Sequence, residues 1–307
     1  MRDILFHIPL PFTNGSLPVH AYGVMAMLGF LAAWLVARHR APKAGISRIN
    51  ITDLCFASLI GGIIGARVFF VIQEADFFFN TARPEFSLLD VFKIWKGGLV
   101  FYGGLFGAFV VVLALLIRRR IDPLNALDVI TPSLCLGMAF GRIGCFLHGC
   151  CYGIPLPDNP WYAAVYPPGA EPYKGGGARL IEAATPLFPS QIVSSINMLI
   201  LFAATSLWLN RRKGPGEVTA LTLILYSVHR FIIEFFRGDT RAPGEFSIAQ
   251  WISLPVFFAG LMVFIYCRLN PRPLPEPVPA DHAQGKPQSA TPPQPANKRP
   301  PKPKKRK

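Results

Sequence analysis

Long apolar runs, separated by shorter polar segments, dominate the chain. Seven of them are close to the ~20 residues that an α-helix needs to cross ~30 Å of hydrocarbon. They cover residues 21–37, 51–72, 97–117, 127–147, 191–209, 218–236 and 248–269. The pattern predicts an all-α polytopic membrane protein with seven transmembrane helices. We expect residues 1–270 to form one membrane-embedded domain of seven spans.

Two segments fall outside this pattern. Residues 154–189, between the fourth and fifth spans, are rich in Pro, Gly and aromatic residues and are long for a connection. We predict an extracytoplasmic loop, which is either a cap over a site or an interfacial aromatic anchor. Residues 271–307 are rich in Pro and end in basic residues. They predict a disordered cytoplasmic tail.

Composition supports the membrane class. The 307 residues are 51% hydrophobic, with a mean hydropathy of +0.37, which is too apolar for an ordinary soluble domain. The net charge of +14 comes from basic residues that lie between and after the apolar runs. This placement indicates membrane orientation rather than nucleic-acid binding.

The basic residues also predict the orientation. They concentrate in the connections after the first, third and fifth spans and in the tail. By the positive-inside rule, the N-terminus lies outside and the C-terminus lies in the cytoplasm. Polar residues from six spans then share one depth, toward the outer leaflet, and we expect a site there. They are His20, Tyr22, Arg67, Lys96, Tyr102, Arg142, Cys145, Ser190, Gln191, Arg230 and Glu234.

Arg142 is the centre of this expected site. An arginine near the end of a span is costly, and its natural ligand at that depth is a phospholipid phosphate. The alternative is a structural arginine that snorkels to the interface. Gly141 and Gly144 beside it permit either close approach of a ligand or tight helix packing.

Other groups in the sequence also have two interpretations. Arg230, Glu234 and Arg237 share one helical face, as a site or as a structural ion pair. Asp128 lies ~21 Å from Arg142 along a helix and indicates a structural carboxylate. Gly98, Gly103 and Gly104, at the start of the third span, indicate ligand approach or helix packing. Cys145, His148, Cys150 and Cys151 are zinc-type residues, but their spacing does not match a standard pair, so no metal or other cofactor is predicted. A zinc site and a vicinal disulfide between Cys150 and Cys151 remain the alternatives.

Five motifs carry a resemblance to a known family. In these motifs and their order the chain resembles prolipoprotein diacylglyceryl transferases, membrane enzymes that lipidate bacterial prolipoproteins. The motifs are His20-Ala21-Tyr22-Gly23, Gly97-Gly98-Leu99-Val100-Phe101-Tyr102-Gly103-Gly104, Gly141-Arg142-Ile143-Gly144 with Phe146 and Gly153, Pro189-Ser190-Gln191, and Arg230-Phe231-Ile232-Ile233-Glu234-Phe235-Phe236-Arg237.

The resemblance implies a bacterial cytoplasmic membrane protein of seven spans with an outside N-terminus. It implies that the diacylglyceryl group of phosphatidylglycerol moves to the thiol of a lipobox cysteine, releasing glycerol phosphate. The catalytic residues implied are Arg142, Arg230, Tyr102, His20, Tyr22 and Glu234. The residues implied to bind phosphatidylglycerol are Arg142, Gly141, Gly144, Gly98, Gly103, Gly104 and Gln191.

The chain also departs from this family. The family usually has His in place of Tyr102 and of Phe188, and Asn, Asn and Glu in place of Cys145, His148 and Cys150. Two other function classes therefore remain open at this point. One is a phospholipid-binding or transport protein without chemistry, and the other is a thiol-redox membrane protein that uses Cys150 and Cys151.

Overall fold

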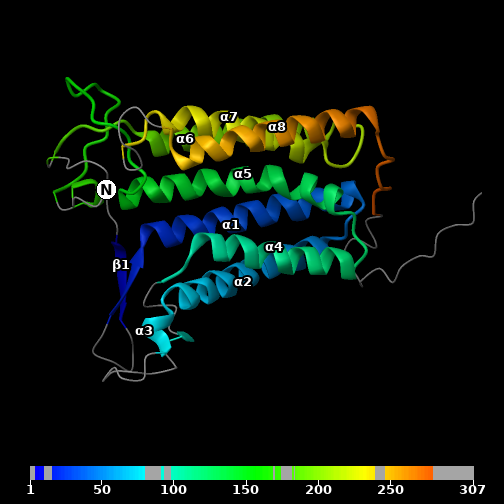
Figure 1. The fold of residues 1–307 in the computed structure, drawn as a ribbon, viewed down its shortest axis with the longest axis horizontal. Helices are drawn as coiled ribbons and strands as arrows, with labels where there is room; N and C mark the ends of the chain where they lie inside the picture. Colours follow the sequence, from blue (N-terminus) through cyan, green and yellow to red (C-terminus); the bar gives the residue numbers. More distant parts are fainter. Residues whose placement is uncertain are drawn as a thin grey trace, which may run out of the picture.

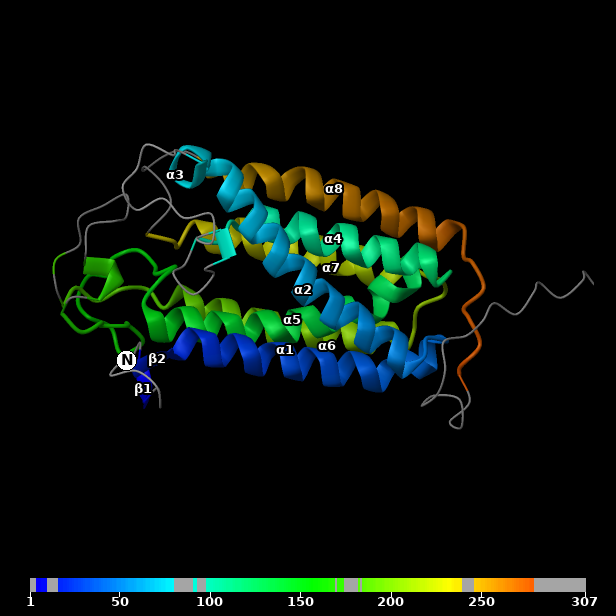
Figure 2. The same cartoon turned by 90° about the horizontal axis from the view of Figure 1, so that it is seen from below.

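The computed structural model describes residues 4–9, 16–79, 91–92, 98–168, 170–173, 182, 184–238 and 246–278. Helices occupy all seven ranges that the hydrophobic pattern predicts, and they lie along a common long axis (Figures 1 and 2). They are α1 (Ala21–Arg40), α2 (Arg48–Gln73), α4 (Phe101–Arg118), α5 (Pro123–His148), α6 (Ser190–Leu209), α7 (Glu217–Glu234) and α8 (Ile248–Leu269). The short helices η1 (Ala41–Ala44), α3 (Ala75–Phe79) and η4 (Glu171–Tyr173) lie between them.

Among the described residues, five helical segments are long and apolar enough to cross a membrane. These are Ala21–Ala44, Arg48–Gln73, Pro123–His148, Ser190–Leu209 and Ile248–Leu269. A shorter apolar helix covers Tyr102–Arg118, and α7 carries Glu217, Arg230 and Glu234 along its length. The fold is that of a polytopic membrane protein, and most of the exposed large side chains on its helices are apolar.

The sequence pattern did not predict the hairpin that precedes α1. Strands β1 (Ile4–Pro9) and β2 (Ser16–His20) pair antiparallel, and Ile4 lies opposite His20. The two strands project from one end of the helix bundle (Figure 1). Residues 150–168 lie at the same end, whereas η1 and residues 271–278 lie at the other (Figure 1).

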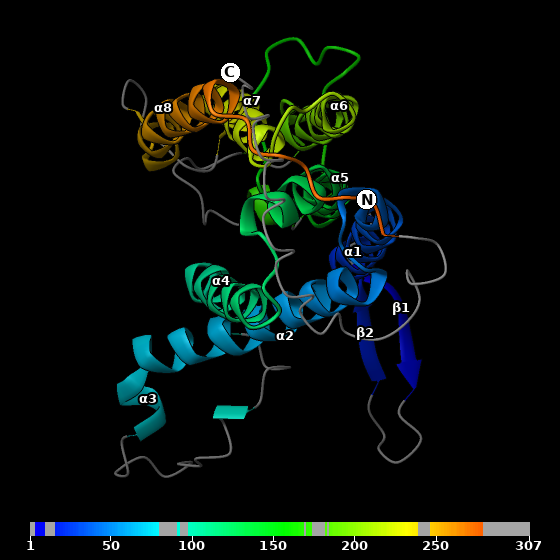
Figure 3. The ribbon, with the colours of Figure 1, turned by 90° about the vertical axis from the view of Figure 1, so that its right-hand side faces the viewer.

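Helix α5 is central, with α1, α6 and α7 packed against it (Figure 3). It begins where Asp122 caps the helix by accepting from the Leu124 amide at 3.1 Å, with Pro123 in the first turn. It ends at Gly149, whose φ of +91° is left-handed. These start and stop signals place Asp128 near one end of the bundle and Arg142 near the other.

Helices α2 and α4 form the tightest pair. A Cβ at Gly65 would collide with the Gly103 carbonyl oxygen, and one at Gly107 with the Gly61 carbonyl oxygen. Glycines on both helices therefore let the two backbones approach closely. This contact fixes the start of α4, where Tyr102 lies.

The described part of residues 154–189 is folded onto the end of the bundle. Pro155 and Ala164 each form a bridge with Leu187, and Tyr152, Ala164, Tyr166 and Leu187 form a small buried core. Trp161, in contrast, is 95% exposed. Residues 174–181 of this segment lie outside the described residues.

The beginning of the predicted tail also has contacts. The Val278 amide donates to the Pro42 carbonyl at 2.9 Å, and Pro275 packs against Gly45. Residues 279–307, the rest of the predicted disordered tail, lie outside the described residues.

Candidate functional site

Arg142 lies in the last two turns of α5, next to open space. A Cβ placed on Gly141 would meet nothing within 4 Å, whereas one on Gly144 would lie 3.1 Å from Cδ2 of Tyr22. Gly144 therefore packs α5 against α1, while Gly141 leaves room beside the arginine. The absence of a side chain at Gly141 permits a ligand to reach the backbone next to Arg142.

The neighbours of Arg142 come from three helices. It is half-buried and lies within electrostatic range of Tyr22 on α1, Cys145 on α5, and His229 and Arg230 on α7. No ion pair between Arg142 and a carboxylate occurs among the described residues. Its positive charge is therefore available to an anion.

Three further charges follow one face of α7 and the turn after it. Arg230 Nη1 lies 2.8 Å from Glu234 Oε2, and Arg237 Nη1 lies 3.9 Å from the same oxygen. Glu234 is only 1% exposed. We call Arg142, Arg230, Glu234 and Arg237 the arginine site. Of its three arginines, Arg230 and Arg237 pair with Glu234, whereas Arg142 has no ion pair with a carboxylate among the described residues.

A cavity of about 590 Å³ adjoins the arginine site. Arg230 and Glu234 line it from α7, Tyr102 and Leu105 from α4, and Ser247 and Ser253 from α8 and its cap, with apolar side chains between them. The cavity brings together three of the predicted catalytic residues, Tyr102, Arg230 and Glu234. Its mixed lining suits a ligand with a polar head and apolar chains.

The remaining predicted residues lie around these features. His20 caps α1 at the end of β2 and is exposed, and Tyr22 lies in the first turn of α1. Gly98 has a φ of +76°, and its carbonyl accepts from Arg67 Nη1 at 3.1 Å. Gly103 and Gly104 face α2. The structure thus gives these three glycines packing contacts, and their role in substrate binding stays a prediction.

Gln191, at the start of α6, holds the loop that follows α5. Its Nε2 donates to the Cys150 carbonyl and to the Tyr166 hydroxyl, both at 2.9 Å. The neighbouring Ser190 hydroxyl donates to the Cys151 carbonyl at 2.8 Å. The Pro-Ser-Gln motif therefore supports the backbone at Cys150 and Cys151, and contact of Gln191 with substrate stays a prediction.

Three cysteines meet beside Arg142, which their sequence spacing did not indicate. The Sγ atoms of Cys145, Cys150 and Cys151 all lie within 4.8 Å of one another, and we call them the thiol cluster. The left-handed residues Gly149 (φ +91°) and Cys151 (φ +57°) turn the chain back over the end of α5. That glycine, directly after the last helical residue, is the sequence signal for this fold-back.

Charge and hydrogen bonding perturb the thiol cluster. Hydrogen bonds from Cys145 and Cys150, with the nearby Arg237 and Arg142 guanidinium groups, lower the pKa of the Cys151 thiol. Hydrogen bonds with Cys145 and Cys151, together with burial, raise the pKa of the Cys150 thiol. The nearby Arg142 and Arg237 thus favour the charged form of Cys151 relative to that of Cys150.

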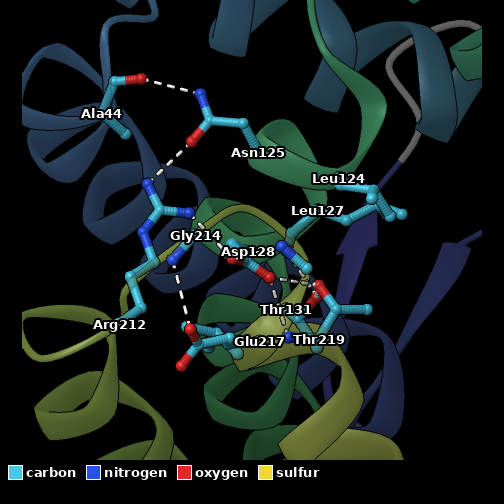
Figure 4. Close-up of polar contacts among 12 residues, drawn as sticks. Ala44, Leu124, Asn125, Leu127, Asp128, Thr131, Arg212, Gly214, Glu217 and Thr219 are labelled. Carbon is cyan, nitrogen blue, oxygen red and sulfur yellow. Dashed lines mark hydrogen bonds and ion pairs between the residues drawn. The ribbon is translucent and has the colours of Figure 1, made fainter. Parts of the chain in front are cut away.

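A second buried charge cluster lies at the opposite end of α5 (Figure 4). Asp128 is fully buried and accepts from Arg212 Nη1 at 2.8 Å, and from the Thr219 hydroxyl and amide at 2.8 and 2.9 Å. Glu217 pairs with Arg268 Nη1 at 3.0 Å. This confirms the interpretation of Asp128 as a structural carboxylate. We call Asn125, Asp128, Arg212, Glu217, Thr219 and Arg268 the balanced network, because its two arginines face two carboxylates.

Comparison with known proteins identifies the family. The model of the family described as prolipoprotein diacylglyceryl transferase matches residues 9–266. The chain belongs to the prolipoprotein diacylglyceryl transferase family. The family match thus includes the arginine site, the cavity and the thiol cluster.

Relatives from distant bacteria carry the same name, phosphatidylglycerol--prolipoprotein diacylglyceryl transferase. The protein of Clostridium tetani is 34% identical over 260 residues, which is 83% of this chain and 96% of that protein. The protein of Erwinia tasmaniensis is 32% identical over 276 residues, or 84% of this chain and 91% of its own. The protein of Bordetella bronchiseptica is 30% identical over 275 residues, or 86% and 96%.

The residues expected to depart from the usual pattern of the diacylglyceryl transferase family lie around the site. The Phe188 ring stacks on Phe236 with centroids 5.0 Å apart, and its backbone amide donates to the Ile154 carbonyl. Phe188 therefore closes the loop onto the end of α7. Tyr102 lines the cavity, and Cys145 and Cys150 belong to the thiol cluster.

Proposed function

We propose that this protein transfers the diacylglyceryl group of phosphatidylglycerol to the thiol of the lipobox cysteine of a prolipoprotein. The products are a thioether and glycerol phosphate. Membership of the diacylglyceryl transferase family supports this, as do the names of the relatives. The observation that carries it is Arg142, which has no ion pair with a carboxylate among the described residues and lies beside open space at Gly141, with Arg230 at the wall of a polar and apolar cavity.

The charge of the reaction fits these residues. A phosphodiester carries one negative charge, and the departing phosphate monoester carries up to two. Arginines placed where the charge develops stabilise the transition state more than the ground state. We assign this role to Arg142 and Arg230, with Glu234 holding Arg230 in position through the 2.8 Å ion pair.

The nucleophile belongs to the substrate. A thiol with an ordinary pKa of ~8.5 must lose its proton before its sulfur attacks the glyceryl carbon. Tyr102 lines the cavity, but a phenol hydroxyl is a poorer general base than an imidazole. Tyr22 lies near Arg142 and His20 at the start of α1, and both stay proposed catalytic residues.

We extend the proposal to membrane topology. All seven long helices, including α4 and α7, span the bacterial cytoplasmic membrane, with the N-terminus outside and the C-terminus in the cytoplasm. The basic connections support this orientation, as do β1 and residues 271–278 at opposite ends of the bundle (Figure 2). A reporter fused after Lys213 is expected to be cytoplasmic, and one inserted near Gly175, outside the described residues, extracytoplasmic. An outside signal at Lys213 would overturn the orientation.

A lipidation assay tests the reaction. Membranes that contain the protein are incubated with a lipobox peptide and phosphatidylglycerol, and the peptide is analysed by mass spectrometry. We expect a thioether-linked diacylglyceryl group on the cysteine and release of glycerol phosphate. A protein that binds phosphatidylglycerol but never modifies the peptide would instead support a binding or transport protein.

A further inference from the structure

The thiol cluster brings together three half-buried sulfurs, which are soft metal ligands. Cys145 comes from α5, and Cys150 and Cys151 come from the turn after it. All three are half-buried, and among the described residues they are a group of three, without His148. Three convergent sulfurs can supply the protein ligands of a metal site that keeps its fourth position for substrate.

The sulfur spacing fits a zinc ion. Zinc–sulfur bonds of about 2.3 Å in a tetrahedron require sulfurs about 3.8 Å apart. The observed upper separation of 4.8 Å is close enough for side-chain rotations to close the site. Zinc with three thiolates carries one net negative charge, and Arg142 and Arg237 lie within electrostatic range of Cys151 to compensate it.

The backbone around the thiols is already fixed. The Cys150 carbonyl accepts from Gln191, and the Cys151 carbonyl accepts from Ser190. Gln191 and Ser190 are both almost fully buried. Metal sites depend on such supporting hydrogen bonds to hold their ligands in place. Because Ser190 and Gln191 of α6 supply these donors, α6 helps to hold the backbone that carries Cys150 and Cys151.

We propose that Cys145, Cys150 and Cys151 bind a zinc ion, and that its fourth ligand is the sulfur of the incoming substrate cysteine. This inference rests on the proposed transfer reaction and adds the means of activating the thiol. A zinc-bound thiol is deprotonated, so the site removes the need for a strong protein base. It thereby accounts for Tyr102, a poorer general base than an imidazole, at the cavity wall.

The chemical step balances without a redox partner. The substrate thiol binds zinc as a thiolate, and its proton passes to the departing phosphate group or to water. The sulfur electron pair forms the bond to the glyceryl carbon, and that carbon's bond to the phosphate oxygen breaks. Glycerol phosphate leaves with the bond electrons, and the neutral thioether, a weaker zinc ligand than a thiolate, is released.

Metal content is the first test. The full-length protein is purified in detergent with a tag that contains no histidine, and zinc is measured by mass spectrometry. We expect about one zinc per chain in the wild type. We expect at least a tenfold lower occupancy in Cys145→Ser, Cys150→Ser and Cys151→Ser, but no change in the matched control Cys55→Ser on α2. Equal zinc in all four variants and the wild type would overturn the site.

Cobalt gives a second readout that does not depend on activity. Cobalt(II) in place of zinc is expected to show thiolate charge-transfer absorption, which Cys55→Ser keeps and the other three variants lose. Adding a lipobox peptide should increase this absorption, whereas the same peptide with Ser in place of its cysteine should not. No response to the cysteine peptide would overturn its ligation to the metal.

The lipidation assay separates this inference from the proposed function. Wild-type protein that lipidates the peptide at full rate while holding no zinc, or with a disulfide among the three cysteines, would overturn the zinc site and leave the transferase intact. Protein that binds zinc through the three thiols but never lipidates the peptide would overturn the transfer reaction.

Discussion

The arginine site and the balanced network are both buried charge clusters near the ends of α5, but they differ in balance. In the balanced network, Arg212 and Arg268 face Asp128 and Glu217, and Asp128 receives hydrogen bonds from Arg212, Thr219 and the Gly216 amide. In the arginine site, Glu234 pairs with Arg230 and Arg237, and Arg142 has no ion pair with a carboxylate among the described residues.

This difference separates a structural role from a chemical one. A buried charge that is fully paired and hydrogen-bonded fixes the packing of its helices, and it has no remaining capacity for a ligand. An arginine at membrane depth that has no carboxylate partner and lies beside open space is stabilised when an anion binds. The comparison therefore predicts loss of stability at one end of α5 and loss of turnover at the other.

The largest expected effect is at the balanced network. Asp128→Ala leaves Arg212 buried without its carboxylate, which is expected to cost about 3–5 kcal/mol of the free energy of unfolding. The measurement is thermal unfolding in detergent, with turnover per folded molecule recorded alongside. The control is Asp53→Ala, which breaks the partly exposed pair with Arg119 and should cost no more than about 1 kcal/mol. Equal losses of unfolding free energy in Asp128→Ala and Asp53→Ala would contradict the structural role of the balanced network.

At the arginine site we expect a catalytic loss of similar size. Arg142→Ala removes a donor that stabilises developing phosphate charge, which typically costs ~3–4 kcal/mol, or roughly a hundred- to thousandfold in rate. Thioether formation is measured at matched membrane abundance. Arg118→Ala, an exposed arginine at the end of α4, is the control and should keep wild-type turnover. A clear loss of folded protein in Arg142→Ala would instead assign this arginine a structural role.

A smaller effect is expected in the loop that joins the arginine site to α6. Gln191→Ala removes donors to the Cys150 carbonyl and the Tyr166 hydroxyl, and each unsatisfied group costs about 1–3 kcal/mol. Amides around residues 150–156 should then exchange hydrogen about tenfold faster or more. Ser190→Ala loses a single hydrogen bond and should show a weaker change. Unchanged exchange in Gln191→Ala would mean that other contacts hold the loop.

The smallest effects are expected from the tail. Truncation after Val278 should leave unfolding and lipidation unchanged, because the tail contacts described here involve residues up to Val278. Truncation after Pro271 also removes the hydrogen bond to Pro42 and should cost up to about 1.5 kcal/mol of stability, without a change in turnover. Both truncated proteins are compared by thermal unfolding and by the lipidation assay. Loss of turnover in either one, with normal insertion, would make the tail part of the mechanism.

The hydrophobic pattern could predict much of this fold, because span length is a property of local sequence. Helix α8 occupies the predicted range of 248–269, and α5 begins four residues early because Asp122 and Pro123 form a start signal. The β1–β2 hairpin escaped prediction because its strands are short and precede the first span. Local pattern also does not separate glycines that pack helices, such as Gly103, from one beside open space, such as Gly141.

The charged residues of the candidate site could be predicted from the sequence, because charges in apolar runs are costly. The thiol cluster could not, because only the fold brings its cysteines together. Arg142, Arg230 and Glu234 are conspicuous in apolar runs because a membrane penalises each of them. Cys145, Cys150 and Cys151 become a group only after the chain turns at Gly149 and α6 fixes that turn. The spacing of the cysteines in the sequence predicts neither the turn at Gly149 nor the hydrogen-bond donors on α6.

The most direct test of the phosphate-binding role of Arg142 compares the variants Arg142→Lys and Arg212→Lys. Lysine keeps the charge but not the planar fork that binds two oxygens. Thioether formation per folded molecule and thermal unfolding are measured for both variants and the wild type. We expect Arg142→Lys to fold normally and to lose most turnover, and Arg212→Lys to lose stability and keep turnover per folded molecule. Near-normal turnover by Arg142→Lys would contradict the phosphate-binding role and leave Arg142 as an arginine that extends to the interface.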